Sequence, residues 1–132
     1  MLVFSPEWAL SYQEAINQNA SYLAASQKWE EGAIALVMSA ENPKAVLLDL
    51  WHGQCREASA AEVLLATEAA TFVISGERAV WQQVLGGKLQ PLMAIMSGKL
   101  KLTKGSIGRL LPYTKAANEL VLSAQNVPTD FE

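Results

Sequence analysis

Two apolar runs separated by four residues place the strongest constraint on the fold of this chain. They read AIALVMSA at residues 33 to 40 and AVLLDLWH at residues 45 to 52, with an Asn-Pro turn between them. Two such runs joined by a short turn predict a β-hairpin. The first run is apolar at odd and even positions alike, which predicts a central strand covered on both faces, whereas Asp49 indicates that the second strand meets water on one face.

Helices and further strands are expected around this hairpin. Ser5, Pro6 and Glu7 form a helix start, and an apolar stripe interrupted only by Asn19 predicts one helix that runs to about Gln27. The following elements are then expected: a more polar strand at 53 to 60, an irregular or short helical connection at 61 to 70, a strand at 71 to 76 ended by Ser75 and Gly76, a short helix at 77 to 87, and a helix at 91 to 97.

The last third of the chain predicts one more strand and a long helix. In KLKLTK, Leu100 and Leu102 alternate with lysines, which is the period of an exposed strand with one apolar face. A final helix is expected from near Ser106 to about Asn126, with Pro112 either kinking it or marking its true first turn. This order lacks regular strand–helix alternation and therefore predicts an α+β fold, with residues 1–132 forming one domain.

Several functional classes are disfavoured by the composition. No apolar run approaches the ~20 residues of a membrane-spanning helix, and the first residues do not resemble a signal peptide, so a cytoplasmic protein is expected. One cysteine and one histidine cannot build a disulfide or a thiolate and imidazole metal cage, so neither a metal nor another cofactor is expected. His52 and Cys55 could pair as base and nucleophile, but a half-buried imidazole and an inert thiol are the favoured interpretation.

Positive charge is concentrated in one part of the chain, although the net charge is -3. Between Arg78 and Asn118 there are seven basic residues and no acidic one. Lys99, Lys101 and Lys104 could protect an edge strand from pairing with another chain. Together with Arg109 they could instead bind anionic head groups or touch a membrane surface, and both interpretations remain open. Nucleic acid is not expected as a partner because the patch lacks aromatic side chains for base stacking.

The segment PLMAIM, directly before these lysines, is apolar on every side of its predicted helix. The simplest interpretation is that this segment forms part of the hydrophobic core. However, Met93 and Met96 lie three positions apart and could form a deformable wall against variable apolar ligands. A tunnel for an acyl chain is therefore predicted here.

The second half of the chain resembles the sterol-carrier-protein family. The similarity lies in ATFVISGERAVWQQVLGGKLQPL and PLMAIMSGKLKLTKGSIGRLL, while the first half agrees by pattern. The resemblance implies a five-stranded, mainly antiparallel sheet covered by helices, with an apolar cavity for fatty acyl chains, sterols or phospholipids and without catalytic residues. Gly105-Ser106 replaces the Gly-Asp of many members, which leaves helix capping to a hydroxyl. Carried over to this chain, the implied cavity lining is Phe72, Ile74, Trp81, Leu85, Leu92, Met93, Ile95, Met96, Leu100, Leu102, Leu110 and Leu111.

The sequence thus predicts a noncatalytic lipid-binding or carrier domain whose partner is a lipid or fatty acyl ligand. One alternative is an interaction or accessory module with the same fold and a filled core. Another is a small enzyme that acts on acyl substrates through His52 and Cys55. Oligomeric state is not predicted.

Overall fold

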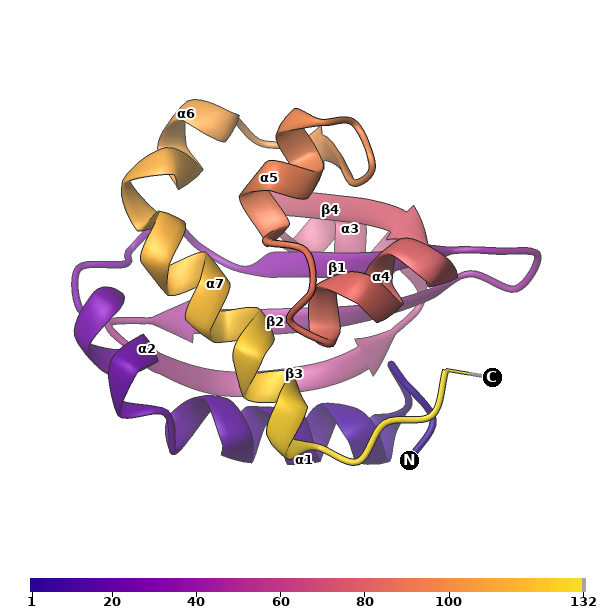
Figure 1. Ribbon diagram of the computed structural model, residues 1–132, viewed down its shortest axis with the longest axis horizontal. Coiled ribbons are helices and arrows are strands. Elements are labelled where there is room, and N and C mark those ends of the chain that lie inside the picture. The colour runs from indigo at the N-terminus through magenta and orange to yellow at the C-terminus, as the bar shows by residue number, and fades with distance from the viewer. Residues whose placement is uncertain (132) are drawn as a thin grey trace.

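The computed structural model describes residues 1–131 and has an α+β fold built on one five-stranded sheet (Figure 1). The strand order is β3-β2-β1-β4-β5, with β1 and β4 parallel and the other three neighbouring pairs antiparallel. This confirms the predicted fold class. The strands are β1 (Ile34–Ser39), β2 (Lys44–Trp51), β3 (Gln54–Ala61), β4 (Phe72–Glu77) and β5 (Lys101–Lys104).

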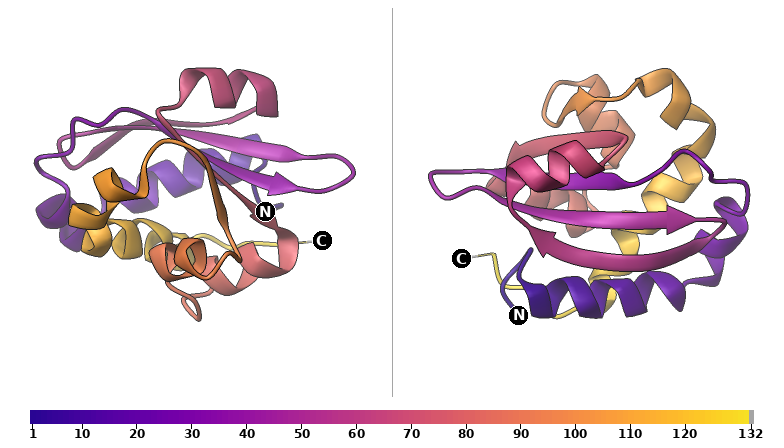
Figure 2. Two further views of the ribbon diagram at one scale, coloured as in Figure 1. Left: turned by 90° about the horizontal axis from the view of Figure 1, so that it is seen from above. Right: turned by 180° about the vertical axis from the view of Figure 1, so that it is seen from behind.

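Helices cover the two faces of the sheet unequally, as the left panel of Figure 2 shows. One face carries α3 (Val63–Ala69), which forms a small apolar layer with alanines and valines of β1, β2 and β4. The other face carries the larger core. The remaining helical segments, which pack on that core or beside it, are α1 (Pro6–Asn17), α2 (Ala20–Ala25), α4 (Arg78–Leu85), α5 (Pro91–Met96), α6 (Ile107–Leu110), η1 (Leu111–Tyr113), α7 (Thr114–Leu122) and η2 (Ser123–Asn126).

The central strand confirms the sequence pattern on which its prediction rested. Ile34 and Leu36 of β1 face the larger core, whereas Ala35 and Val37 face α3, and all four are buried. A strand between two packed layers needs apolar side chains at both parities. The hairpin of β1 and β2 is confirmed as well, with Ile34 opposite Leu48.

The prediction of one continuous helix over residues 6 to 27 is wrong in one respect, because the structure has two helices there, α1 and α2. Asn19 caps α2: its Oδ1 accepts hydrogen bonds from the backbone N–H groups of Ser21 and Tyr22. Its Nδ2 donates to Ser123 Oγ at 3.0 Å. An Asn side chain competes in this way with helical backbone bonds. The break turns α2 away from α1 and leaves Leu23 partly exposed.

The final helix is also interrupted, at Pro112. Ser106 Oγ accepts the Gly108 N–H, which confirms capping by a hydroxyl, and α6 follows. Pro112 then lies in the 3-10 segment η1 between α6 and α7. Because proline has no N–H to donate, it interrupts the α-helical hydrogen bonds and bends the path. Pro112 is therefore a kink rather than the first turn of the helix.

Two smaller differences concern the middle of the chain. The ambiguous segment at 61 to 70 forms the helix α3, and β4 continues through Ser75 and Gly76 to Glu77. Phe72 and Ile74 share one face of β4, as predicted, and both are buried. Since the short α3 returns the chain to the sheet beside β1, β4 pairs with β1 in parallel.

Candidate functional site

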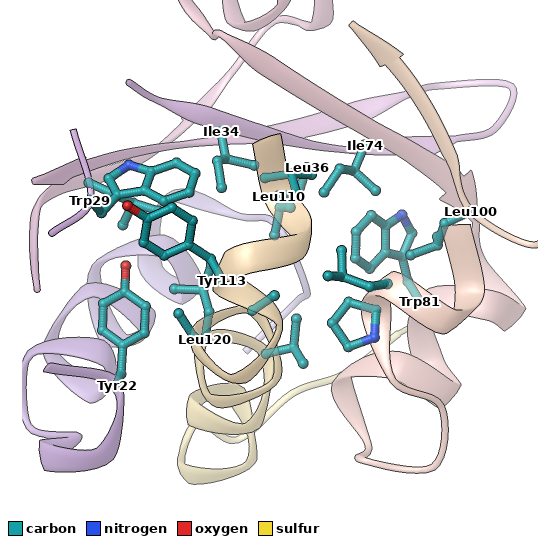
Figure 3. Close-up of a pocket in the computed structure, with 16 residues that line it drawn as sticks. Tyr22, Trp29, Ile34, Leu36, Ile74, Trp81, Leu100, Leu110, Tyr113 and Leu120 are labelled. Atoms are coloured by element: carbon teal, nitrogen blue, oxygen red, sulfur yellow. The ribbon is translucent and has the colours of Figure 1, made fainter. Parts of the chain in front are cut away.

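An apolar pocket lies between the sheet and the helices α5 to α7 (Figure 3). Its volume is about 40 Å³. The sheet supplies inward-facing side chains of β1, β2 and β4, and the helices close the opposite side. The lining residues are Tyr22, Trp29, Ile34, Leu36, Leu50, Ile74, Trp81, Pro91, Leu92, Leu100, Leu110, Tyr113, Ala116, Ala117, Leu120 and Val121.

Three of the four polar atoms on the aromatic rings around this pocket have hydrogen-bond partners, whereas the Tyr22 hydroxyl has none among residues 1–131. Trp81 Nε1 donates to the Val37 carbonyl at 2.9 Å, and Trp29 Nε1 donates to the Gly32 carbonyl at 2.9 Å. Tyr113 OH donates to the Lys28 carbonyl at 3.1 Å. These bonds fix the rings and turn their apolar surfaces toward the pocket. Apart from the Tyr22 hydroxyl, the site therefore favours hydrocarbon over a polar ligand.

Aromatic packing holds one end of the pocket in place. The Trp29 ring centroid lies 4.9 Å from that of Tyr113 in an edge-on arrangement and 5.7 Å from that of Phe72. The Tyr22 hydroxyl is neutral at physiological pH even at its ordinary pKa of 10.0, and burial raises that pKa further, to about 12. No formal charge is therefore contributed by this phenol.

Five of the twelve predicted lining residues are found around the pocket, namely Ile74, Trp81, Leu92, Leu100 and Leu110. Four others lie in the core or against it without lining the pocket: Phe72, Leu85, Ile95 and Leu102. Ligand contact by any of these side chains stays a prediction.

The remaining three predicted residues point outward. Met93 and Met96 are 58% and 67% exposed, and Leu111 is 47% exposed. The expectation that they face the interior does not describe this structure. The six-residue α5 buries Leu92 and Ala94 instead, and a helix this short has room for only one inward face.

Sequence reasoning missed the part of the pocket wall that comes from the first half of the chain. Ile34, Leu36 and Leu50 line the pocket from β1 and β2, and Tyr22 and Trp29 line it from the preceding segment. For Ile34 and Leu36, the alternation of side chains along the central strand could have indicated that both face the same side of the sheet. No sequence signal placed Trp29, because its position depends on packing against Phe72 and Tyr113, which are distant in the sequence.

The four basic candidates fall into two pairs. Lys99 and Lys101 are exposed, and their ammonium groups have no hydrogen-bond or ion-pair partner within the described residues 1–131. Lys104 Nζ instead donates to the Thr67 carbonyl at 2.9 Å. Arg109 bonds to Glu31 Oε1, from Nε at 2.8 Å and from Nη2 at 2.5 Å. Lys104 thus connects β5 to α3, and Arg109 connects α6 to the segment before β1.

His52 and Cys55 do not form a catalytic pair. His52 Nε2 lies 2.5 Å from Glu30 Oε2, and its ring stacks on Trp51. Cys55 is 1% exposed, and burial, reinforced by the Asp49 charge, raises the pKa of its thiol to about 12. A buried neutral thiol without a nearby base is a poor nucleophile.

Among residues 1–131, no group of three or more His, Cys, Asp or Glu side chains is arranged to hold a metal ion. The helices in the same range are all too short or too polar to cross a membrane.

The sequence and the fold are similar to those of known sterol carrier proteins. A crystal structure of sterol carrier protein 2 is 42% identical, with a TM-score of 0.85 over 96% of this chain and 99% of that one. A conserved hypothetical protein from Thermus thermophilus, described as possibly a sterol carrier protein, is 41% identical, with a TM-score of 0.85 over 98% of this chain and 92% of that one. No curated protein matches the chain.

More distant structures share the fold alone. Palmitated SCP2L2 from Aedes aegypti is 14% identical, with a TM-score of 0.53 over 81% of this chain and 91% of that one. Residues 12–116 match the SCP-2 sterol transfer family, a range that includes the sheet and most of the pocket wall. The protein therefore belongs to the SCP-2 sterol transfer family.

Proposed function

We propose that this protein binds lipids in its apolar pocket and carries them without chemical change. The proposed ligands are fatty acyl chains, phospholipids or sterol-like molecules. Membership in a family of lipid-carrier domains that are generally not enzymes supports this function. The structural observation that carries it is the pocket wall, which is apolar and whose tryptophan N–H groups are already bonded to backbone carbonyls.

Ligand entry requires the pocket to widen. Its volume of about 40 Å³ is far below the roughly 300–1,000 Å³ of typical ligand pockets. The sheet side is held by continuous backbone hydrogen bonds between strands. The opposite side consists of the short segments α5, α6 and η1, together with α7. We propose that these helices move outward from the sheet to admit the hydrocarbon.

The free energy gained by burying the acyl chain gives the expected affinity for such a ligand. About ten buried methylenes at ~0.8 kcal/mol each contribute roughly 8 kcal/mol before the cost of ordering the chain. A dissociation constant in the micromolar range, on the order of 1 μM or weaker, follows. Reversible binding of this strength suits a carrier that must also release its ligand.

A stoichiometric uptake experiment tests the proposal. Delipidated protein is mixed with palmitate, and native mass spectrometry is expected to show one bound chain. In the variant Ala117→Phe, a ring is added to a helical position that lines the pocket, and uptake is expected to fall at least tenfold. Ala20→Phe adds the same ring to an exposed position of α2 and is the matched control.

The outcome that contradicts lipid binding is also well defined. Failure of the unmodified protein to take up palmitate, phospholipid and cholesterol would overturn the proposal. Equal uptake by Ala117→Phe and Ala20→Phe would show that the ligand lies elsewhere. Circular dichroism of both variants checks that each one is folded.

The small pocket volume supports a second candidate function. A family member whose core closes upon itself would serve as an interaction or accessory module, and about 40 Å³ is close to a filled core. A larger side chain at Met93 would not distinguish the two functions because Met93 is exposed. Ala117→Phe does distinguish them: a carrier should stay folded and lose ligand uptake, whereas a module with a filled core should lose stability.

We propose no catalytic role for this protein. The enzyme hypothesis depended on His52 acting on Cys55, and the structure pairs His52 with Glu30 instead. Cys55→Ala is expected to leave lipid uptake unchanged. A cytoplasmic location and transient contact with a membrane surface remain parts of the proposal that rest on the sequence.

A further inference from the structure

A second groove, lined by both polar and apolar atoms, lies at a corner of the sheet on the face that α3 covers, opposite the face that carries the apolar pocket. It is bordered by the ends of β1 and β4, the start of α4 and the segment that leads into β5, and its volume is about 320 Å³. The side chains that give it polar character are Ser39, Ser75, Glu77, Lys99 and Lys101. This groove is therefore different in chemistry from the pocket.

The groove carries a net positive charge. Lys99 and Lys101 contribute two positive charges against the single carboxylate of Glu77. Within residues 1–131, none of these three groups has an ion-pair partner. The hydroxyls of Ser39 and Ser75 add hydrogen-bond donors. An anion is the ligand that this combination favours.

Leu100 separates the groove from the pocket. It stands between the two groove lysines in sequence, yet its own side chain points the other way, is 1% exposed and lines the pocket. Gly76 borders the groove, and a Cβ placed on Gly76 would lie 2.3 Å from Leu100 Cδ2. The two spaces lie on opposite faces of the sheet and approach each other beyond the last β4–β5 pair, Ser75 with Lys101, where Leu100 packs beside Gly76.

The Leu100 backbone is held by a hydrogen bond from its N–H to the Ala94 carbonyl at 3.0 Å, so at this boundary only a change of side-chain rotamer can open a path. Trp81 also lies beside Gly76, but its Nε1 is tied to the Val37 carbonyl. The Leu100 side chain has no polar atom and is held by packing alone.

We propose that the groove binds the anionic head group of a single-chain lipid, with Lys99 and Lys101 as its cationic contacts. The acyl chain then passes Leu100 into the apolar pocket. The head group is a carboxylate or a phosphate, since both are anions that accept hydrogen bonds from ammonium and hydroxyl groups. This inference rests on the proposed lipid-binding function and adds the head-group site and the chain path.

Two ligands of equal chain length separate head-group binding from chain binding. Laurate and 1-dodecanol differ in charge and share a twelve-carbon chain. Isothermal titration calorimetry measures the dissociation constant of each for the unmodified protein and for Lys99→Gln/Lys101→Gln. The double variant is expected to weaken laurate binding about five- to twentyfold, a sum of two exposed ionic contacts, and to change dodecanol binding less than twofold.

A matched control removes the same charge elsewhere. Lys88→Gln/Lys115→Gln replaces two exposed lysines that do not line the groove, and laurate binding is expected to stay within twofold. Equal weakening by both double variants would assign the effect to overall charge and overturn the inference. Butyrate, which is too short to reach past Leu100, should bind at least a hundredfold more weakly than laurate. Equally tight butyrate binding would overturn the connection between groove and pocket.

Nuclear magnetic resonance locates the two ends of the ligand. Laurate should shift the amide signals of Lys99 and Lys101 more than dodecanol does, whereas both ligands should shift the Leu100 methyl signals. Unchanged Leu100 methyls with bound laurate would overturn the proposed chain path. If neither ligand binds, the proposed function fails. If both bind and the lysine variant binds them normally, only the head-group inference fails.

Discussion

At the scale of single residues, two glycines before and after β5 show how the same backbone conformation serves different purposes. Gly98 and Gly105 both have positive φ, at +83° and +93°. A Cβ on Gly98 would meet nothing within 4 Å. A Cβ on Gly105 would lie 2.5 Å from Phe72 Cδ1 and 2.9 Å from the Thr71 carbonyl. Gly105 is therefore required for close packing as well as for its backbone conformation.

The two positions give a matched pair of substitutions. Gly98→Ala is expected to lower the free energy of unfolding by about 1 kcal/mol, the cost of a left-handed conformation with a side chain. Gly105→Ala is expected to lower it by about 3 kcal/mol or more, because the Thr71 backbone or the Phe72 ring must also shift. Urea denaturation measures both. Equal losses would show that the contact with Phe72 is not tight.

At the scale of elements, the helical side of the pocket is tied to the segment between α2 and β1. Arg109 of α6 bonds to Glu31, and Tyr113 of η1 donates to the Lys28 carbonyl. The Arg109 guanidinium also lies 5.4 Å from the centre of the Phe72 ring. Because α6 and η1 border the pocket, these contacts hold in place the side that we propose opens.

Loosening this connection should speed ligand entry. Glu31→Gln removes the charge that binds Arg109, and uptake of laurate is expected to become about two- to fivefold faster, with stability lowered by ~1 kcal/mol or less. Stopped-flow tryptophan fluorescence measures the rate, since Trp29 and Trp81 line the pocket. Glu30→Gln is the control because Glu30 contacts His52 rather than Arg109. Equal rates in the two variants would mean that another segment opens.

Element-scale contacts also explain how α1 is fixed beside the sheet. The Asn17 side chain accepts from the Cys55 N–H at 2.8 Å and donates to the Cys55 carbonyl at 2.9 Å. Gln13 likewise bonds to the Ala58 N–H and the Arg56 carbonyl. These amides cover the outer edge of β3, which limits pairing with another chain. The opposite edge is the short, lysine-bearing β5.

At the scale of the whole molecule, the pocket lies on the helix-rich side of the sheet, and within residues 1–131 the opposite side is covered by α3 alone (Figure 2). A ligand that enters there replaces contacts between helices and sheet with contacts to hydrocarbon. Such a ligand binds the folded chain and not the unfolded one, so it must stabilise the fold.

The temperature of unfolding therefore distinguishes a carrier from a filled-core module. Ligand at a free concentration 100 times its dissociation constant contributes about 2.7 kcal/mol, which corresponds to a rise in Tm of roughly 10 °C for a chain of this size. Differential scanning calorimetry with laurate is the measurement. A module with a closed core should show no rise at any laurate concentration that leaves the protein monodisperse.

The sequence alone determined the fold class, the central strand and the lysine-bearing edge strand, because these follow from local periodicity and from segments that resemble a known family. It also predicted that Leu92, Leu100 and Trp81 lie inward. Only the tertiary structure decided that Asn19 breaks the first helix, that Trp29 reaches the pocket and that Met93 and Met96 face outward. A helix that is apolar all round has no pattern to show which side is buried, so its direction depends on the elements packed against it.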